Sequence, residues 1–134
     1  MRMKNVMNPQ PHTLREDNTV LQASEFMRVS RIRNLPVVDK NNVVIGLITY
    51  REIIDSLTTN KAGVPIKNVM IKEVKAVGPD TPLKGALSVM IENKFGCLPI
   101  VDHERKLLGL VTESDLLKVL YEAVELPEDF YINK

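Results

Sequence analysis

The sequence predicts an α/β (α+β) fold made of two similar units, and three observations support this prediction. The chain repeats itself at a spacing of 63 residues without a gap, and 14 of the 51 positions from Lys4 to Ile54 are identical to their counterparts. Each copy contains two short runs rich in β-branched residues around a polar turn, as a β-hairpin does. Each copy also contains apolar residues at helical spacing. A repeat of this length is typical of a duplicated supersecondary unit.

In the first copy we expect a strand, a helix, two strands and a second helix. Thr13-Leu14 is a short extended piece, and Asn18 can cap the helix that follows it. The hairpin would use residues 35–38 and 43–48, because residues 39–42 have turn chemistry. The apolar positions of the two helices are Val20, Ala23, Phe26 and Met27, then Ile53, Ile54 and Leu57.

The second copy predicts the same order of elements with clearer helix signals. Thr81 is a good N-cap, and Pro82 is suited to the first helical position. Residues 98–101 and 107–111 form the second hairpin in this interpretation. The apolar helix positions are Leu83, Ala86, Leu87 and Met90, then Leu116, Leu117, Leu120 and Val124.

The repeat also predicts the domain boundaries. We expect one repeat at residues 1–60, a polar linker at 61–65, a second repeat at 66–124 and an acidic C-terminal segment at 125–134 that ends the last helix. A unit of about 60 residues is marginally stable by itself, so the two repeats are expected to share one compact core.

Composition excludes several classes of protein. The net charge of +1 argues against nucleic-acid binding through bulk charge. No apolar stretch is long enough to cross a membrane, and no secretory signal follows Met1. The single cysteine, Cys97, excludes an internal disulfide and is consistent with the cytoplasm. His12 and His103 lack the spacing of metal ligands, and no nucleophile lies near a candidate base, so an enzyme is not expected.

The segment from Gly109 to Asp115 is the strongest candidate for a binding site. A strand ends at Val111 and a helix begins after Thr112, so unpaired backbone N–H groups there favour an anion. Thr112 and Ser114 add hydroxyl groups, and Asp115 adds an acceptor suited to ribose hydroxyls. Alternatively, Thr112 and Asp115 form a capping box that only satisfies the helix start, and the two roles are compatible.

The order of these motifs, met twice, resembles a pair of CBS domains, also called a Bateman module. This order of motifs is "LPVVD", then a hairpin, then "GLVTESDLL". The resemblance implies tandem β-α-β-β-α repeats packed as a pseudo-twofold pair through their sheets. It also implies that adenosine compounds (AMP, ADP, ATP or S-adenosylmethionine) bind between the repeats, that modules often form homodimers, and that the role is regulatory rather than catalytic.

The resemblance also implies two sets of ligand-binding residues. In the first set, hydroxyls and a carboxylate would hold phosphate and ribose, two apolar residues would flank adenine, and a leading segment would close the cleft: Thr112, Ser114, Asp115, Val111, Ile32, Met7, Pro9 and His12. The second set is Thr49, Arg51, Glu52, Arg33, Phe95, Met70 and Lys75. Glu52 stands where the family usually has aspartate, so we expect the Asp115 site to bind more strongly.

Arg28, Arg31 and Arg33 form the tightest basic cluster of the sequence. They either complement a helix C-terminus or clamp a phosphate, and the sequence leaves open whether they share a pocket with Asp115. The overall expectation is a regulatory module that senses an adenine nucleotide, without an obligatory cofactor, as a homodimer and with a regulated protein partner. The alternative is a ligand-free interaction scaffold.

Overall fold

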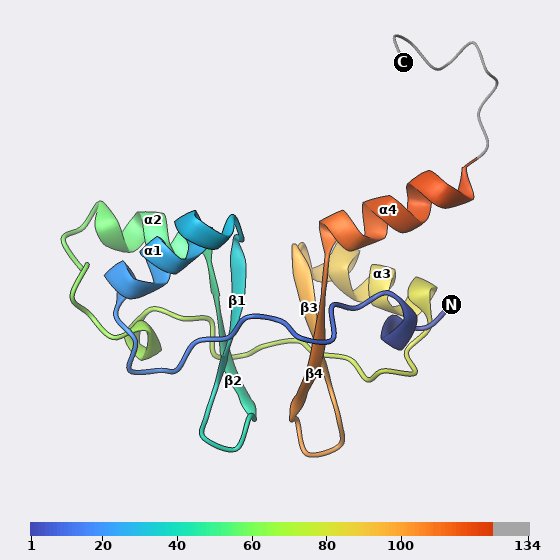
Figure 1. Ribbon diagram of the computed structural model, residues 1–134, viewed down its shortest axis with the longest axis horizontal. Coiled ribbons are helices and arrows are strands. Elements are labelled where there is room, and N and C mark those ends of the chain that lie inside the picture. The colour runs from blue at the N-terminus through green and yellow to red at the C-terminus, as the bar shows by residue number, and fades with distance from the viewer. Residues whose placement is uncertain (125–134) are drawn as a thin grey trace, which may run out of the picture.

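The computed structural model describes residues 1–124, and it confirms an α+β fold built from two repeats (Figure 1). The first repeat contains α1 (Val20–Ser30), β1 (Asn34–Val38), β2 (Val44–Thr49) and α2 (Tyr50–Leu57). The second contains α3 (Leu83–Asn93), β3 (Cys97–Val101), β4 (Leu107–Thr112) and α4 (Glu113–Ala123). Two 3-10 turns, η1 (Met3–Asn5) and η2 (Ile66–Asn68), precede the repeats. The predicted acidic segment at 125–134 lies outside the described residues.

Each repeat is centred on an antiparallel hairpin, and the two hairpins have the same register. Leu35 pairs with Ile48 in the first, and Leu98 pairs with Val111 in the second. Nearly all residues of these strands are buried, which explains why they read as continuous apolar runs instead of alternating ones. The expected first strand at Thr13-Leu14 is reduced to a single parallel bridge between Leu14 and Val37.

Two predicted helix starts are wrong by one residue. The N-cap of α1 is Thr19, whose hydroxyl accepts a hydrogen bond from the Gln22 N–H at 3.1 Å while the Gln22 side chain accepts from the Thr19 N–H at 2.9 Å. This reciprocal pair is a capping box. Asn18 instead accepts from the Arg15 N–H in the preceding turn. At α3, Pro82 occupies the N-cap position rather than the first helical one.

The segments that precede the two repeats are exchanged between them. The N-terminal segment runs along the second repeat, where the Met3 N–H donates to the Thr81 carbonyl at 3.0 Å (Figure 1). The segment after the linker runs along the first repeat, where Ile71 and Leu47 exchange two backbone hydrogen bonds. Met3 is therefore fully buried in the second repeat's core, and Ile66 is fully buried in the first's. This exchange ties the two cores together.

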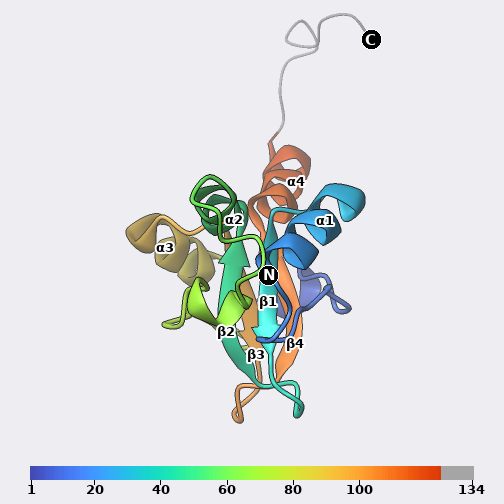
Figure 2. The same cartoon turned by 90° about the vertical axis from the view of Figure 1, so that its left-hand side faces the viewer.

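The repeats also meet directly through their hairpins. One apolar cluster joins the hairpin tips, and a second joins the sheets at Leu47, Cys97 and Leu110. The hairpin turns point to one end of the molecule and the helices gather at the other (Figure 2). Strands β2 and β4 therefore deliver the starts of α2 and α4 to the same end. None of the helices within residues 1–124 has the length and apolar character needed to span a bilayer.

Candidate functional site

The start of α4 is a complete capping box. The Asp115 Oδ2 atom accepts hydrogen bonds from the Thr112 N–H at 2.8 Å and from the Thr112 hydroxyl at 3.1 Å. The Thr112 hydroxyl in turn lies 3.4 Å from the Asp115 N–H. These contacts occupy Oδ2, whereas Oδ1 makes no hydrogen bond to any of residues 1–124. One carboxylate can therefore cap the helix through one oxygen and accept from a ligand through the other.

A cleft of about 490 Å³ opens between the repeats beside this helix start. A volume of this size suits a small organic ligand. Both repeats and the N-terminal segment contribute to its lining, which consists of Asn8, Pro11, His12, Arg31, Ile32, Arg33, Asn34, Gly96, Leu110, Thr112, Glu113, Ser114 and Asp115. The predicted residues Thr112, Ser114, Asp115, Ile32 and His12 are thus brought together.

Arg31 and Arg33 also line the cleft, so two members of the basic cluster share a pocket with Asp115. Arg31 ends α1 in the left-handed conformation, with φ of 57°. The Arg33 guanidinium carbon lies 5.5 Å from the centre of the Tyr50 ring, a cation–π distance. Within the described residues, neither arginine has a carboxylate at ion-pair distance. Two cations from the first repeat therefore share one cleft with Asp115 from the second.

The other residues of the first predicted set lie around the cleft without lining it. Val111 is fully buried in the second repeat's core, and Pro9 is exposed. Met7 packs over Gly109, where any Cβ atom would collide with its sulfur. The Met7 side chain therefore holds the N-terminal segment against β4.

The resemblance implied that a leading segment from Met7 to His12 closes the cleft, and Asn8 and Pro11 of that segment line it. The lining residues that were not predicted for this site are Arg31, Asn34, Gly96, Leu110 and Glu113. Arg31 had been singled out in the sequence only as a member of the basic cluster. Asn8 reaches the cleft because it exchanges two backbone hydrogen bonds with Leu110, at 2.9 and 3.0 Å. Partners so far apart in the chain leave no local pattern that could have identified them.

Three members of the second predicted set line different hollows, Glu52 one, Phe95 another and Arg33 the Asp115 cleft. Glu52 accepts hydrogen bonds from the Thr49 N–H at 2.7 Å and the Thr49 hydroxyl at 2.6 Å, so it caps α2. The hollow of about 330 Å³ that Glu52 lines contains none of the other six members of the set. Met70 packs against Gly46, Phe95 faces the second repeat's helices, and Arg51 and Lys75 are exposed. This second site stays a prediction.

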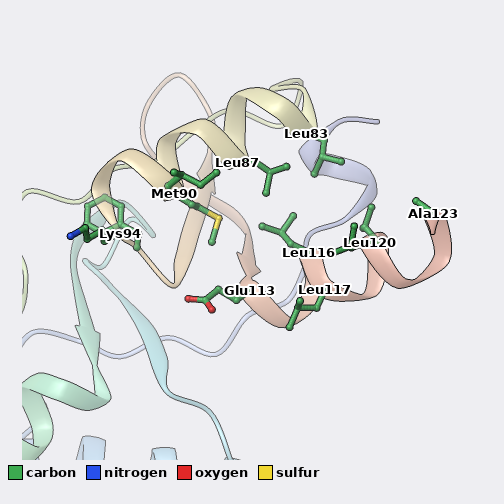
Figure 3. Close-up of a pocket in the computed structure, with 12 residues that line it drawn as sticks. Leu83, Leu87, Met90, Lys94, Glu113, Leu116, Leu117, Leu120 and Ala123 are labelled. Atoms are coloured by element: carbon green, nitrogen blue, oxygen red, sulfur yellow. The ribbon is translucent and has the colours of Figure 1, made fainter. Parts of the chain in front are cut away.

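An apolar groove of about 630 Å³ lies between α3 and α4 (Figure 3). Leucine side chains from both helices point into it, among them Leu87 and Leu116, and Glu113 lies at its end nearer the cleft. No residue of α4 is buried, whereas α2 buries Ile53 at the position equivalent to Leu116. The second repeat therefore leaves its closing helix more open to solvent than the first.

Neither thiol nor metal chemistry is supported among the described residues. Burial and, to a smaller extent, the nearby Glu113 carboxylate raise the pKa of the Cys97 thiol to about 12. Such a thiol stays protonated near neutral pH and is a poor nucleophile. Residues 1–124 contain no group of three or more histidine, cysteine or acidic side chains that could hold a metal ion.

Comparison with known proteins gives relatives of several kinds. A 17.7 kDa protein of Acidianus ambivalens is 32% identical over 111 residues, which cover 83% of this chain and 68% of the relative. The inosine-5′-monophosphate dehydrogenase of Methanocaldococcus jannaschii is 37% identical over 108 residues. That match covers 79% of this chain but only 21% of the enzyme, so the similarity concerns a part of it.

Solved structures and a family model agree on the fold. The CBS domain pair of protein MJ0100, crystallised in complex with 5′-methylthioadenosine and S-adenosyl-L-methionine, superposes with a TM-score of 0.83 at 25% identity. The match covers 90% of this chain and 99% of that one. The CBS domain model matches twice, at residues 3–59 and 66–122. The chain therefore belongs to the CBS domain family and contains a tandem pair of its repeats.

Proposed function

We propose that this CBS pair is a regulatory module that binds an adenosine compound in the Asp115 cleft and catalyses no reaction. The observation that carries the proposal is the lining of that cleft, which combines Asp115, whose Oδ1 atom has no hydrogen bond to residues 1–124, with two cations from the opposite repeat. The bound adenosine compounds named for the MJ0100 pair support the same ligand class.

The chemistry of the cleft suits the parts of a nucleotide. Asp115 Oδ1 is available to accept hydrogen bonds from ribose hydroxyls, because Thr112 holds the other oxygen. Arg31 and Arg33 can make charge-assisted hydrogen bonds to a phosphate. The positive end of the α4 dipole, where Ser114 lies, favours the same anion. Ile32 and Leu110 offer apolar surface to the adenine ring.

A ligand in this cleft would touch both repeats, so it would favour the arrangement of the repeats that it fits best. Its effect is limited to the difference between its affinities for the two arrangements. The readout would be a regulated protein partner or a homodimer. The exposed apolar residues of α4 support an assembly, since Leu117 and Tyr121 are 62% and 76% exposed. The same surface favours the second candidate function, a scaffold that needs no ligand.

A thermal-shift panel of AMP, ADP, ATP, S-adenosylmethionine and NAD tests the proposal. A ligand at 100 times its dissociation constant adds about 2.7 kcal/mol to the free energy of unfolding. We therefore expect the melting temperature to rise by several degrees with at least one adenosine compound. No response to any member of the panel would favour the scaffold.

Two variants separate ligand binding from capping. Asp115→Asn keeps one side-chain oxygen for the cap but replaces the second acceptor by a donor, so most of the ligand-induced shift should disappear while the ligand-free protein changes little. Glu52→Gln makes the matched change at the start of α2 and should leave the shift intact. If Asp115→Asn responds to the ligand like the unmodified protein, the carboxylate has only its capping role.

A further inference from the structure

A second hollow adjoins the cleft beside Asp115. Arg31, Ile32 and Arg33 also line this second hollow, of about 400 Å³, between α1 and α2. Arg28 lines this second hollow but not the cleft. Arg28 lies in the last turn of α1, and Arg31 is the C-cap residue of the same helix. Two arginines therefore line both hollows, and a third lines only the second hollow.

All of the charged side chains that line the second hollow are positive. Beside the three arginines it is lined by apolar residues and by Ser24 and Tyr50, and no acidic side chain is among them. Within residues 1–124 none of the three arginines forms an ion pair. Three guanidinium groups without a carboxylate repel one another, and an anionic ligand bound among them would relieve that repulsion.

The second repeat provides an internal control for this observation. Ile91 and Lys94 in the α3–α4 groove stand at the positions of Arg28 and Arg31, and Gly96 stands at the position of Arg33. Glu113 replaces Tyr50, so the equivalent groove is apolar with one cation and one carboxylate (Figure 3). The fold itself therefore does not require a run of cations at this place.

We propose that the Asp115 cleft takes nucleoside diphosphates or triphosphates in preference to the monophosphate, and that Arg28 determines this preference. The inference rests on the proposed function. The ribose would lie at Asp115, the first phosphate would meet Arg31 and Arg33, and the following phosphates would extend along α1 to Arg28. A monophosphate is too short to reach Arg28, so that residue contributes only to the longer ligands.

Isothermal titration with AMP, ADP and ATP tests the proposal on the full chain. The affinity should rise from AMP to ATP. Arg28→Gln should lower the affinity for ATP about three- to tenfold, as expected for one exposed charge-assisted contact, and should leave the affinity for AMP unchanged. Lys94→Gln removes one positive charge from the second repeat, at the counterpart of Arg31, and should affect neither nucleotide. Added salt should reduce the preference for ATP over AMP, because the extra contacts are between exposed charges.

Three results would overturn the inference. Equal affinities of the unmodified protein for AMP and ATP would remove the preference itself. A loss of ATP affinity in Lys94→Gln as large as in Arg28→Gln would assign the effect to bulk charge. Equal weakening of AMP and ATP by Arg28→Gln would place the residue at the first phosphate. In each case AMP still binds, so the proposed function survives, whereas a protein that binds none of these nucleotides would contradict both.

Discussion

The starts of α4 and α2 are built alike but face different surroundings. In both, an acidic side chain three residues after a threonine accepts from the threonine N–H, at 2.8 Å for Asp115 and 2.7 Å for Glu52. Asp115 then lines a cleft with Arg31 and Arg33, whereas Glu52 lines a hollow whose one cation is Lys61. The helix cap is a local property that both copies retain. The cations in the cleft of Asp115 come from the other repeat, whereas the cation beside Glu52 comes from the linker, so the surroundings of the two caps have diverged.

The exchanged segments that precede the two repeats, unlike the surroundings of the caps, have stayed equivalent. Met3 and Ile66 are each fully buried in the core of the repeat that does not directly follow in sequence. The structural framework is therefore nearly symmetric, while the surface beside the two helix starts is not.

The largest effect is expected where the exchanged segments enter the two cores. Met3→Ala and Ile66→Ala should each lower the free energy of unfolding by about 2–5 kcal/mol, because each leaves a cavity in a closed core. Urea denaturation measures both. Ile91→Ala, at a side chain that is 73% exposed, is the control and should change stability by less than about 0.5 kcal/mol. A small effect at only one of the two buried positions would show that the repeats do not depend equally on the exchange.

A smaller effect should distinguish two equivalent glycines. A Cβ atom at Gly109 would lie 2.8 Å from the Asn8 carbonyl oxygen, which the hydrogen bonds to Leu110 hold in place. At Gly46 the three atoms nearest to the added one all belong to the flexible Met70 side chain. We expect Gly109→Ala to destabilise the protein by about 1–3 kcal/mol and Gly46→Ala to cost less.

Nucleotide titration of the same two variants sharpens this prediction. Asn8 lines the Asp115 cleft, so Gly109→Ala should also weaken nucleotide binding, whereas Gly46→Ala should not. Equal stabilities of the two variants would mean that the N-terminal segment moves away from the added Cβ atom as easily as the Met70 side chain does.

The smallest effect concerns the two caps. The Thr112 hydroxyl lies 3.4 Å from the Asp115 N–H, but no corresponding bond joins the Thr49 hydroxyl to the Glu52 N–H among the described residues. Thr112→Ala should therefore cost about 1 kcal/mol of stability, and Thr49→Ala should cost less. Thr112→Ser should restore most of the loss in thermal unfolding, since it keeps the hydroxyl. A loss that serine does not restore would point to the methyl group.

The duplicated hairpins, the amphipathic helices and the paired caps could all be predicted from the sequence. These features arise from chemistry between residues close in the chain. A threonine followed three residues later by an acid caps a helix wherever it is placed, and a β-branched run around a turn forms a hairpin. One of the two wrong helix starts, Thr19 in place of Asn18, arose because both residues are good caps and Gln22 completes the box only with Thr19.

Which residues face one another across the repeats depends on the tertiary structure. It exchanged the leading segments, which brought Asn8 to Leu110, and it placed Arg31 and Arg33 opposite Asp115. It also buried Val111 in a core, although the sequence predicted that residue beside a ligand. Contacts between positions so far apart depend on how two folded surfaces pack, and local periodicity carries no record of that packing.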